Sequence, residues 1–181
     1  ALSGADSTNN LGAGNTFTDN EKGIFLERGA DNTGSRDNTF TANHEAGVKA
    51  SGAPHTEVRN NVFSDHDGEK TIHFTGESPN GVIQGNRILD STGPENAIQI
   101  GGESGDSLIA DNVVAGGTLG GISAGPANVD VVNNTVYDNG DIGITVGDGG
   151  GEVRDNLVYD NRIGLAFDGS TGVTATDNVV K

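Results

Sequence analysis

Two lysines and two histidines stand close together in the N-terminal half of this 181-residue chain: Lys49, His66, Lys70 and His73. A lysine can neutralise the carboxylate of a sugar acid and so acidify the neighbouring C–H, and a histidine or lysine can then remove that proton. These residue types suit lyase-like or epimerase-like chemistry on a uronate polymer. We take the four as candidate catalytic residues. The alternative is that they are ordinary polar residues of an exposed surface.

Uncharged and weakly basic residues accompany this group along the chain. His44, Ser51, Thr75 and Gln99 carry hydrogen-bonding side chains within the same stretch. Such groups can fix the hydroxyls of a bound sugar through directed hydrogen bonds. We therefore expect these four residues to bind substrate beside the candidate catalytic residues.

Acidic residues in the same stretch suggest a metal site. Asp65, Asp67 and Glu69 alternate within one short segment, and calcium binds oxygen ligands of this kind, about six to eight of them at once. Calcium is the one cofactor that these residues indicate. A second acidic loop with Glu103 and Asp106 is an alternative calcium ligand set, and three histidines (His44, His66 and His73) are an alternative for zinc or copper.

An internal repeat must position these side chains. An Asn followed two residues later by an apolar residue recurs along the whole chain, with spacings of 22 to 26 residues. The residue three positions before this Asn is apolar in most repeats. The repeating positions are Asn15, Asn38, Asn61, Asn86, Asn112, Asn134, Asn156 and Asn178.

A third apolar element follows each Asn by eight to twelve residues. It begins with a small residue and an aliphatic one, as in Gly23-Ile24 and Gly143-Ile144, and a further apolar residue stands two positions beyond. Apolar residues two apart are typical of strands with one buried face, so each repeat contains three short strands. The residues between the two apolar positions then face outward, and Lys49, His73 and Gln99 should lie in one row on successive coils, roughly 5–10 Å apart.

Turn residues recur with the same period. We expect the repeating Asn to occupy a tight turn, because it tolerates left-handed backbone angles, and its amide can also hydrogen-bond along the stack. Aspartates recur four residues later, at Asp19, Asp65, Asp90, Asp138 and Asp160, where a second turn begins. Tyr137 and Tyr159 are one repeat apart, so we expect them to stack on an outer face, either as an aromatic ladder or as a platform for a sugar.

Two segments, NNTVYDNGDIGITV and RDNLVYDNRIGLAF, contain the repeat in its most regular form. They resemble the right-handed parallel β-helix superfamily, including pectate-lyase-like enzymes, mannuronan C5-epimerases and NosD-type repeat proteins. The resemblance covers about residues 15–180. It implies an all-β fold: a right-handed, single-stranded parallel β-helix of about seven coils with three parallel sheets. It also implies a substrate groove on the outer face of one sheet, although the Tyr-Gly-x-Asp-Pro-His signature of the epimerases is absent from this sequence.

The repeat indicates one domain over residues 1–181. Residues 1–14 form an irregular or partial first coil, residues 15–177 form seven coils, and residues 178–181 begin a further coil. Both ends fall within the repeat, so we expect a fragment of a longer solenoid whose ends are capped by the rest of the chain or by another subunit.

Composition limits the partners. With 10 basic and 26 acidic residues the net charge is −16, which argues against nucleic acid because phosphate binding requires a basic surface. No apolar run is long enough for a membrane span. We expect an extracellular or cell-surface module, with a periplasmic one as an alternative, that binds a polysaccharide and processes it if it is an enzyme. The alternative function is that of a non-catalytic structural or adhesive solenoid at a cell or virion surface.

Overall fold

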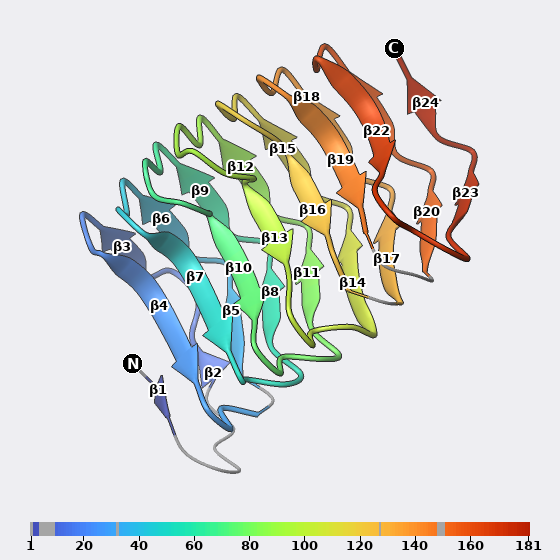
Figure 1. Cartoon of the computed structure of the whole chain (residues 1–181). Helices are drawn as coiled ribbons and strands as arrows, with labels where there is room; N and C mark the ends of the chain where they lie inside the picture. Colours follow the sequence, from blue (N-terminus) through green and yellow to red (C-terminus); the bar gives the residue numbers. More distant parts are fainter. Residues whose placement is uncertain (1, 4–9, 32, 127, 148–150) are drawn as a thin grey trace.

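The computed structural model describes residues 2–3, 10–31, 33–126, 128–147 and 151–181. Over these residues the chain is all-β and forms a solenoid of about seven turns. Figure 1 shows the coils stacked in chain order, with the two termini at opposite ends. Three eight-stranded sheets run along the stack, and every strand pairs in parallel with the equivalent strand of the next coil. The predicted β-helix is confirmed.

The three sheets differ in the length of their strands. Sheet A contains β1 (Leu2–Ser3), β4 (Lys22–Glu27), β7 (Ala46–Ser51), β10 (Ile72–Thr75), β13 (Ile98–Ile100), β16 (Ile122–Ala124), β19 (Ile142–Val146) and β22 (Ile163–Phe167). Sheet B contains β2 (Asn10–Leu11), β5 (Gly34–Arg36), β8 (Glu57–Arg59), β11 (Val82–Gln84), β14 (Ser107–Ala110), β17 (Val129–Val132), β20 (Glu152–Arg154) and β23 (Thr174–Thr176). Sheet C contains β3 (Thr16–Thr18), β6 (Thr39–Thr41), β9 (Val62–Ser64), β12 (Arg87–Leu89), β15 (Val113–Ala115), β18 (Thr135–Tyr137), β21 (Leu157–Tyr159) and β24 (Val179–Val180).

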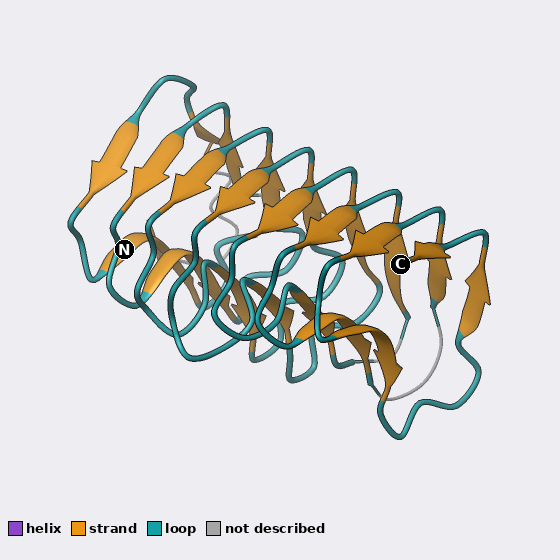
Figure 2. Ribbon diagram, turned by 90° about the horizontal axis from the view of Figure 1, so that it is seen from above, coloured by secondary structure: helices purple, strands orange, loops and turns teal. Residues whose placement is uncertain are grey.

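Figure 2 shows the strands of the three sheets following one another along the solenoid. One apolar core lies between the sheets. Each strand contributes one or two inward side chains, because successive residues of a strand point to opposite faces. Equivalent positions stack in columns, as Phe17, Phe40 and Phe63 do in sheet C with ring centroids 4.8 and 4.6 Å apart. A chain with few large side chains can fold in this way because each column needs only one apolar residue per coil.

The repeating Asn forms a ladder through the interior. The side-chain oxygen of Asn112 accepts hydrogen bonds from the backbone N–H and the amide of Asn86, at 2.9 and 3.1 Å, and its own amide donates to Asn134 at 3.0 Å. The same hydrogen bonds join the repeating asparagines from Asn15 to Asn178. The exception is Asn38, which donates to Asn61 through its backbone N–H and not through its side-chain amide. The predicted hydrogen bonding along the stack is confirmed.

The predicted backbone angle of this Asn is wrong. The left-handed residue is the one before it, such as Asp37, Asn60 or Asp111, with φ between 52° and 57°. The Asn itself must keep its side chain inside the coil to reach the next Asn, so the turn is made by its exposed neighbour. The second set of turns agrees with the prediction, since Asp19, Asp65, Asp90, Asp138 and Asp160 all have φ between 53° and 57°.

The ends of the chain continue the same sheets. Within residues 1–14, β1 pairs with β4 and β2 pairs with β5, whereas residues 1 and 4–9 lie outside the described part. At the other end, β24 pairs with β21. The rest of the predicted domain division stays a prediction.

Candidate functional site

Five of the candidate residues lie on the outer face of sheet A: Lys49, Ser51, His73, Thr75 and Gln99. The pairing register aligns Phe25 with Lys49, Lys49 with His73, and His73 with Gln99 on β4, β7, β10 and β13. The predicted row is therefore confirmed as an arrangement. Ser51 and Thr75 pair with each other two positions further along β7 and β10, and form a second outward row beside the first.

A column of glutamates forms ion pairs with the lysines of this face. Each glutamate stands three residues before the first buried aliphatic residue of its sheet A strand, and the column consists of Glu21, Glu45, Glu69 and Glu95. Glu45 accepts a hydrogen bond from Lys49 at 2.8 Å and pairs with Lys22 on its other oxygen. Lys70 pairs with Glu95 and lies 3.7 Å from Glu69. These lysines are thus neutralised by glutamates in the folded protein.

Close stacking of two loops holds Lys70 and Glu95 together. Gly68 and Gly93 lie on successive coils, and a side chain at Gly93 would overlap the carbonyl oxygen of Gly68. Only residues without a Cβ allow the loops that precede β10 and β13 to approach so closely. Lys70 is consequently almost fully buried between them.

Glu45 is the strongest electrostatic centre of the face. Burial alone would raise the pKa of its carboxyl, but the hydrogen bonds from Lys22 and Lys49 outweigh burial and lower the pKa to about 2. A carboxyl whose pKa is lower in the folded protein than in the unfolded chain stabilises the fold above its unfolded pKa, and this contribution is lost as the pH falls toward the folded pKa. The stabilisation by Glu45 should therefore disappear between about pH 4.5 and pH 2.

We expect Glu45→Gln to lower the free energy of unfolding by about 1–3 kcal/mol near neutral pH. The difference from the unchanged protein should shrink to a small fraction as the pH approaches 2, because the carboxyl is then protonated in both states. Urea unfolding at a series of pH values measures it. Glu69→Gln is the matched control, since Glu69 occupies the same column but its side chain is 62% exposed. Equal, pH-independent effects of both substitutions would contradict this role of Glu45.

His73 is the neutral member of the row. Burial lowers the pKa of its imidazole to about 4, and the nearby charges of Lys70 and Lys49 act in the same direction. At neutral pH the ring is therefore uncharged and can accept a proton or a hydrogen bond. A half-buried neutral imidazole beside two lysines is the arrangement that proton abstraction from a sugar acid would need.

Gln99 adjoins His73 and has an unused acceptor. Its side-chain Oε1 is buried and has no hydrogen-bond partner. Beyond it, a recess of about 260 Å³ is lined by Glu95, Leu119, Asp141 and Thr145, of which Thr145 belongs to the same outward row. The outward row of sheet A thus runs from Lys49 through His73 and Gln99 to Thr145, which lines this recess.

His66 does not belong to this face. It is 1% exposed and lies under the turn, with its ring tilted against Phe63 at 5.9 Å and its Nδ1 3.2 Å from the carbonyl oxygen of Asn43. Burial lowers the pKa of its imidazole. A buried ring cannot reach a ligand on the outer face, so the geometry separates His66 from Lys49, Lys70 and His73.

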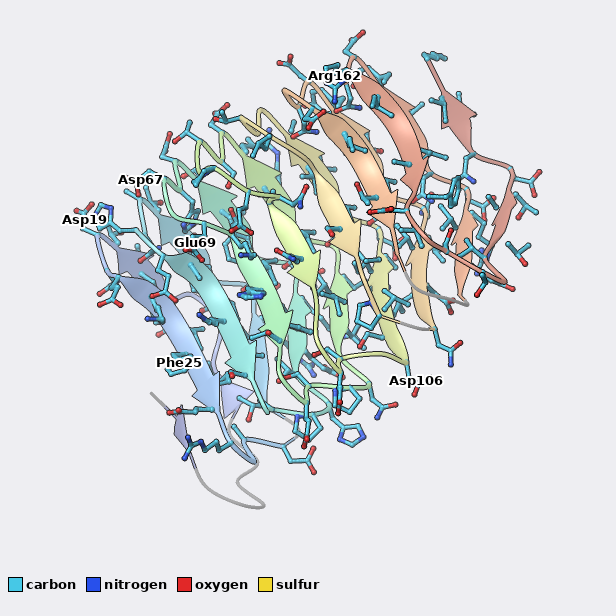
Figure 3. The ribbon with its side chains drawn as sticks, in the orientation of Figure 1. Asp19, Phe25, Asp67, Glu69, Asp106 and Arg162 are labelled. Carbon is cyan, nitrogen blue, oxygen red and sulfur yellow. The ribbon has the colours of Figure 1, made fainter. Side chains whose placement is uncertain are left out.

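The predicted calcium ligands are not gathered either. Asp65, Asp67 and Glu69 are all exposed, and Asp65 makes the left-handed turn. Asp67 instead pairs with His44, whose Nδ1 lies 2.9 Å from its carboxylate, at an exposed position. Figure 3 labels Asp67 and Glu69, which belong to the loop between β9 and β10. Over the described residues, no group of three or more His, Asp or Glu side chains is placed to hold a metal ion.

Sequence reasoning missed Lys22 and the pairing of the glutamates with the lysines, and it singled out only Glu69 among the four, as a calcium ligand. The signal was present: Glu21, Glu45, Glu69 and Glu95 recur at one repeat position on four successive coils. Like side chains at one repeat position stack in a β-helix, and cations are expected between stacked carboxylates. The same reasoning applies to Asp141 and Arg162, which follow in this column and form an ion pair.

The sequence profile of the family described as the right-handed β-helix region matches residues 1–63 and 30–180. The chain belongs to this family. No curated protein matches the sequence. No helix of the described residues is long and apolar enough to cross a membrane.

Solved structures similar to this β-helix include three epimerases. The periplasmic alginate epimerase AlgG matches 92% of the chain with a TM-score of 0.67 and 17% identity, over 49% of its own length. The A-modules of the Azotobacter vinelandii mannuronan C-5 epimerases AlgE6 and AlgE4 match 93% of the chain with TM-scores of 0.60 and 0.57 and identities of 16% and 15%, over 57% and 56% of their lengths. The chain thus spans about half of each, and at these identities the likeness concerns the fold.

Proposed function

We propose that this β-helix binds a polysaccharide along the outer face of sheet A. The observation that carries the proposal is the aligned row of Lys49, His73 and Gln99, in which a neutral imidazole stands beside a buried, unpartnered amide oxygen. The Gln99 side chain is only half-buried, so rotation of its amide can turn the unpartnered oxygen toward a hydroxyl-rich ligand, which also supplies donors and acceptors for His73. The recess beside Glu95 and Thr145 continues this face, so a polymer can run parallel to the solenoid axis.

We propose a uronate-containing polymer as the ligand. The lysines of the face can bind a sugar carboxylate, but in the free protein Glu45 and Glu95 occupy them. A uronate must therefore compete with these glutamates, which favours a polymer that makes several contacts at once. The alginate epimerases of similar fold support this choice by analogy. By the same analogy we propose an extracellular, cell-surface or periplasmic location.

Turnover is the second candidate function. It rests on His73, whose neutral ring lies beside Lys49 and Lys70 and could remove the proton next to a uronate carboxyl. Lyase activity would appear as new ultraviolet absorbance from unsaturated ends, and epimerase activity as a change of sugar configuration by NMR. Binding without either change would leave a non-catalytic carbohydrate-binding module.

The test is binding to a panel of neutral and uronate polysaccharides, with and without calcium. We expect Gln99→Ala to weaken binding of the recognised polymer at least about ten-fold, since a polar group that pairs with the ligand is worth about 1–3 kcal/mol. Gln84→Ala is the matched control, because Gln84 lies on the outer face of sheet B. If no polymer binds, or if the two substitutions act equally, the proposed site is wrong and a structural or adhesive solenoid is favoured.

A further inference from the structure

The outer face of sheet C differs from the other two faces in charge. In its eight strands, all of which the structure describes, the outward residues are threonine, serine, valine, leucine, alanine and tyrosine, with a single charged residue, Arg87. None of them is a carboxylate, although the chain has 26 acidic residues. Val62 and Leu157 expose 41% and 36% of their surface here. The outward residues of β3 and β6 are all threonine, whereas the apolar and aromatic ones begin at β9. We call the latter, from β9 to β21, the apolar strip: Val62, Leu89, Val113, Ala115, Tyr137, Leu157 and Tyr159.

Aspartates border the apolar strip along one edge. The turn from sheet C to sheet A contains Asp19, Asp65, Asp90, Asp138 and Asp160, all exposed and all in the left-handed region. Asn or Gly would satisfy this backbone equally well, so the aspartates add charge that the turn does not require. No ion pair between described residues involves any of the five.

Aromatic rings join the strip to this edge. Tyr137 and Tyr159 stack in parallel with ring centroids 4.9 Å apart, and each is followed directly by one of the aspartates, Asp138 or Asp160. A lysine or arginine suits such a neighbourhood, because its alkyl stem packs on a ring while its charge reaches the carboxylate. Arg162, two residues beyond Asp160, is already paired with Asp141 and leaves the aspartates of the edge unneutralised.

The opposite edge is less available to a cation. Asp155 is paired with Arg154 at 2.8 Å. Asp111 accepts hydrogen bonds from Gln84 at 2.8 Å and from Asn133 at 2.7 Å. Asp37 and Asp177 at this edge make no ion pair between described residues, so three of its four aspartates remain unneutralised, against all five at the edge formed with sheet A. The edge formed with sheet A therefore offers more free negative charge to a cationic partner.

We propose that the apolar strip and its aspartate edge form a docking surface for a cationic amphipathic segment of a partner protein. Three-residue strands give a strip about 10 Å wide, and the five strands from β9 to β21 give a length of about 20 Å. One α-helix, about 10–12 Å in diameter and about 20 Å long for 13 residues, covers such a strip. A basic helix would place its apolar face on Leu157 and Val62 and its lysines at the aspartates. A second copy of this chain, with its charge of −16, would be repelled instead.

The test uses the full chain and two helix-forming peptides of lysine and leucine with identical composition. One has a single apolar face and the other is scrambled so that this face is lost. We expect the amphipathic peptide to bind about ten-fold more tightly than the scrambled one, since only the former can bury apolar area on the strip. Equal binding would mean that the acidic protein adsorbs any polycation, and it would overturn the proposal.

Matched substitutions locate the surface. Leu157→Gln on the strip should weaken binding about five-fold by removing apolar area, whereas Leu119→Gln, at a residue with 38% exposure outside the strip, should leave it unchanged. Asp138→Asn with Asp160→Asn should weaken binding about five- to ten-fold. Asp106→Asn with Glu103→Gln removes the same charge elsewhere and should have less effect. Circular dichroism checks that each variant folds, and equal effects of strip and control variants would refute the site.

Discussion

Replacing Phe63 by alanine should lower the free energy of unfolding by about 3–5 kcal/mol. Phe63 is fully buried in the core, its ring stacks on Phe40 with centroids 4.6 Å apart, and it also packs against His66. Its removal leaves a cavity that stacked coils cannot close, because the spacing of the strands is set by backbone hydrogen bonds. The loss of stability should be large, because each strand contributes only one or two side chains to the core.

Chemical unfolding followed by circular dichroism measures this effect. Val62→Ala is the control, because Val62 precedes Phe63 in the same strand but points outward and is 41% exposed. It should change the free energy of unfolding by less than about 0.5 kcal/mol. If the two substitutions lower the free energy of unfolding equally, the column of Phe17, Phe40 and Phe63 does not stabilise this half of the solenoid.

The arrangement of the sheets could be predicted because the repeat determines register. Apolar residues two apart fix which face of a strand is buried, and a constant repeat places equivalent residues side by side. Lys49, His73 and Gln99 could therefore be aligned from the sequence, and the pairing confirms that alignment. The turn aspartates followed from the same reasoning, since few residues accept a left-handed backbone.

The environment of each polar side chain could not be predicted in the same way. His66 was assigned to the outer surface with the other charged residues, yet it is buried. It stands five residues after Asn61, a position that Asn20, Asn43, Asn139 and Asn161 fill in other coils. That position points inward, as the bonds from Asn43 to Phe17 and from Asn161 to Val136 show. A polar residue inside a coil resembles a loop residue in the sequence, because hydrophobicity alone does not reveal it.

Ion pairing was the other feature that the sequence reasoning missed. Lys49 and Lys70 were expected to present free positive charge to a ligand, whereas Glu45 and Glu95 bind them. The charge of a row of lysines depends on the residues at neighbouring repeat positions, here the recurring glutamates, so a row of cations in the sequence does not by itself define a cationic surface. This pairing is the reason that the proposed binding role rests on His73 and Gln99 and not on net positive charge.

Asn112→Ala should also destabilise the protein strongly, by about 3–5 kcal/mol, because the loss involves several buried hydrogen bonds at once. The Asn112 oxygen accepts from the N–H and the amide of Asn86, and its amide donates to Asn134 and to the carbonyl oxygen of Ile83. Alanine leaves the backbone N–H of Asn86 without its partner, and it removes one hydrogen bond each from Asn86 Nδ2, Asn134 Oδ1 and the carbonyl oxygen of Ile83. These atoms lie in the interior, where water does not readily replace the lost bonds.

The size of this effect distinguishes an interior ladder from ordinary turn hydrogen bonds. Asn128→Gly is the control: Asn128 donates one exposed bond, to Asp106 at 3.0 Å, and its left-handed backbone suits glycine. We expect it to cost less than about 1 kcal/mol. Urea unfolding of both variants decides the question. A comparable cost for the two would mean that water satisfies the ladder atoms once Asn112 is lost, and that the repeating Asn is retained for the turn and not for the interior.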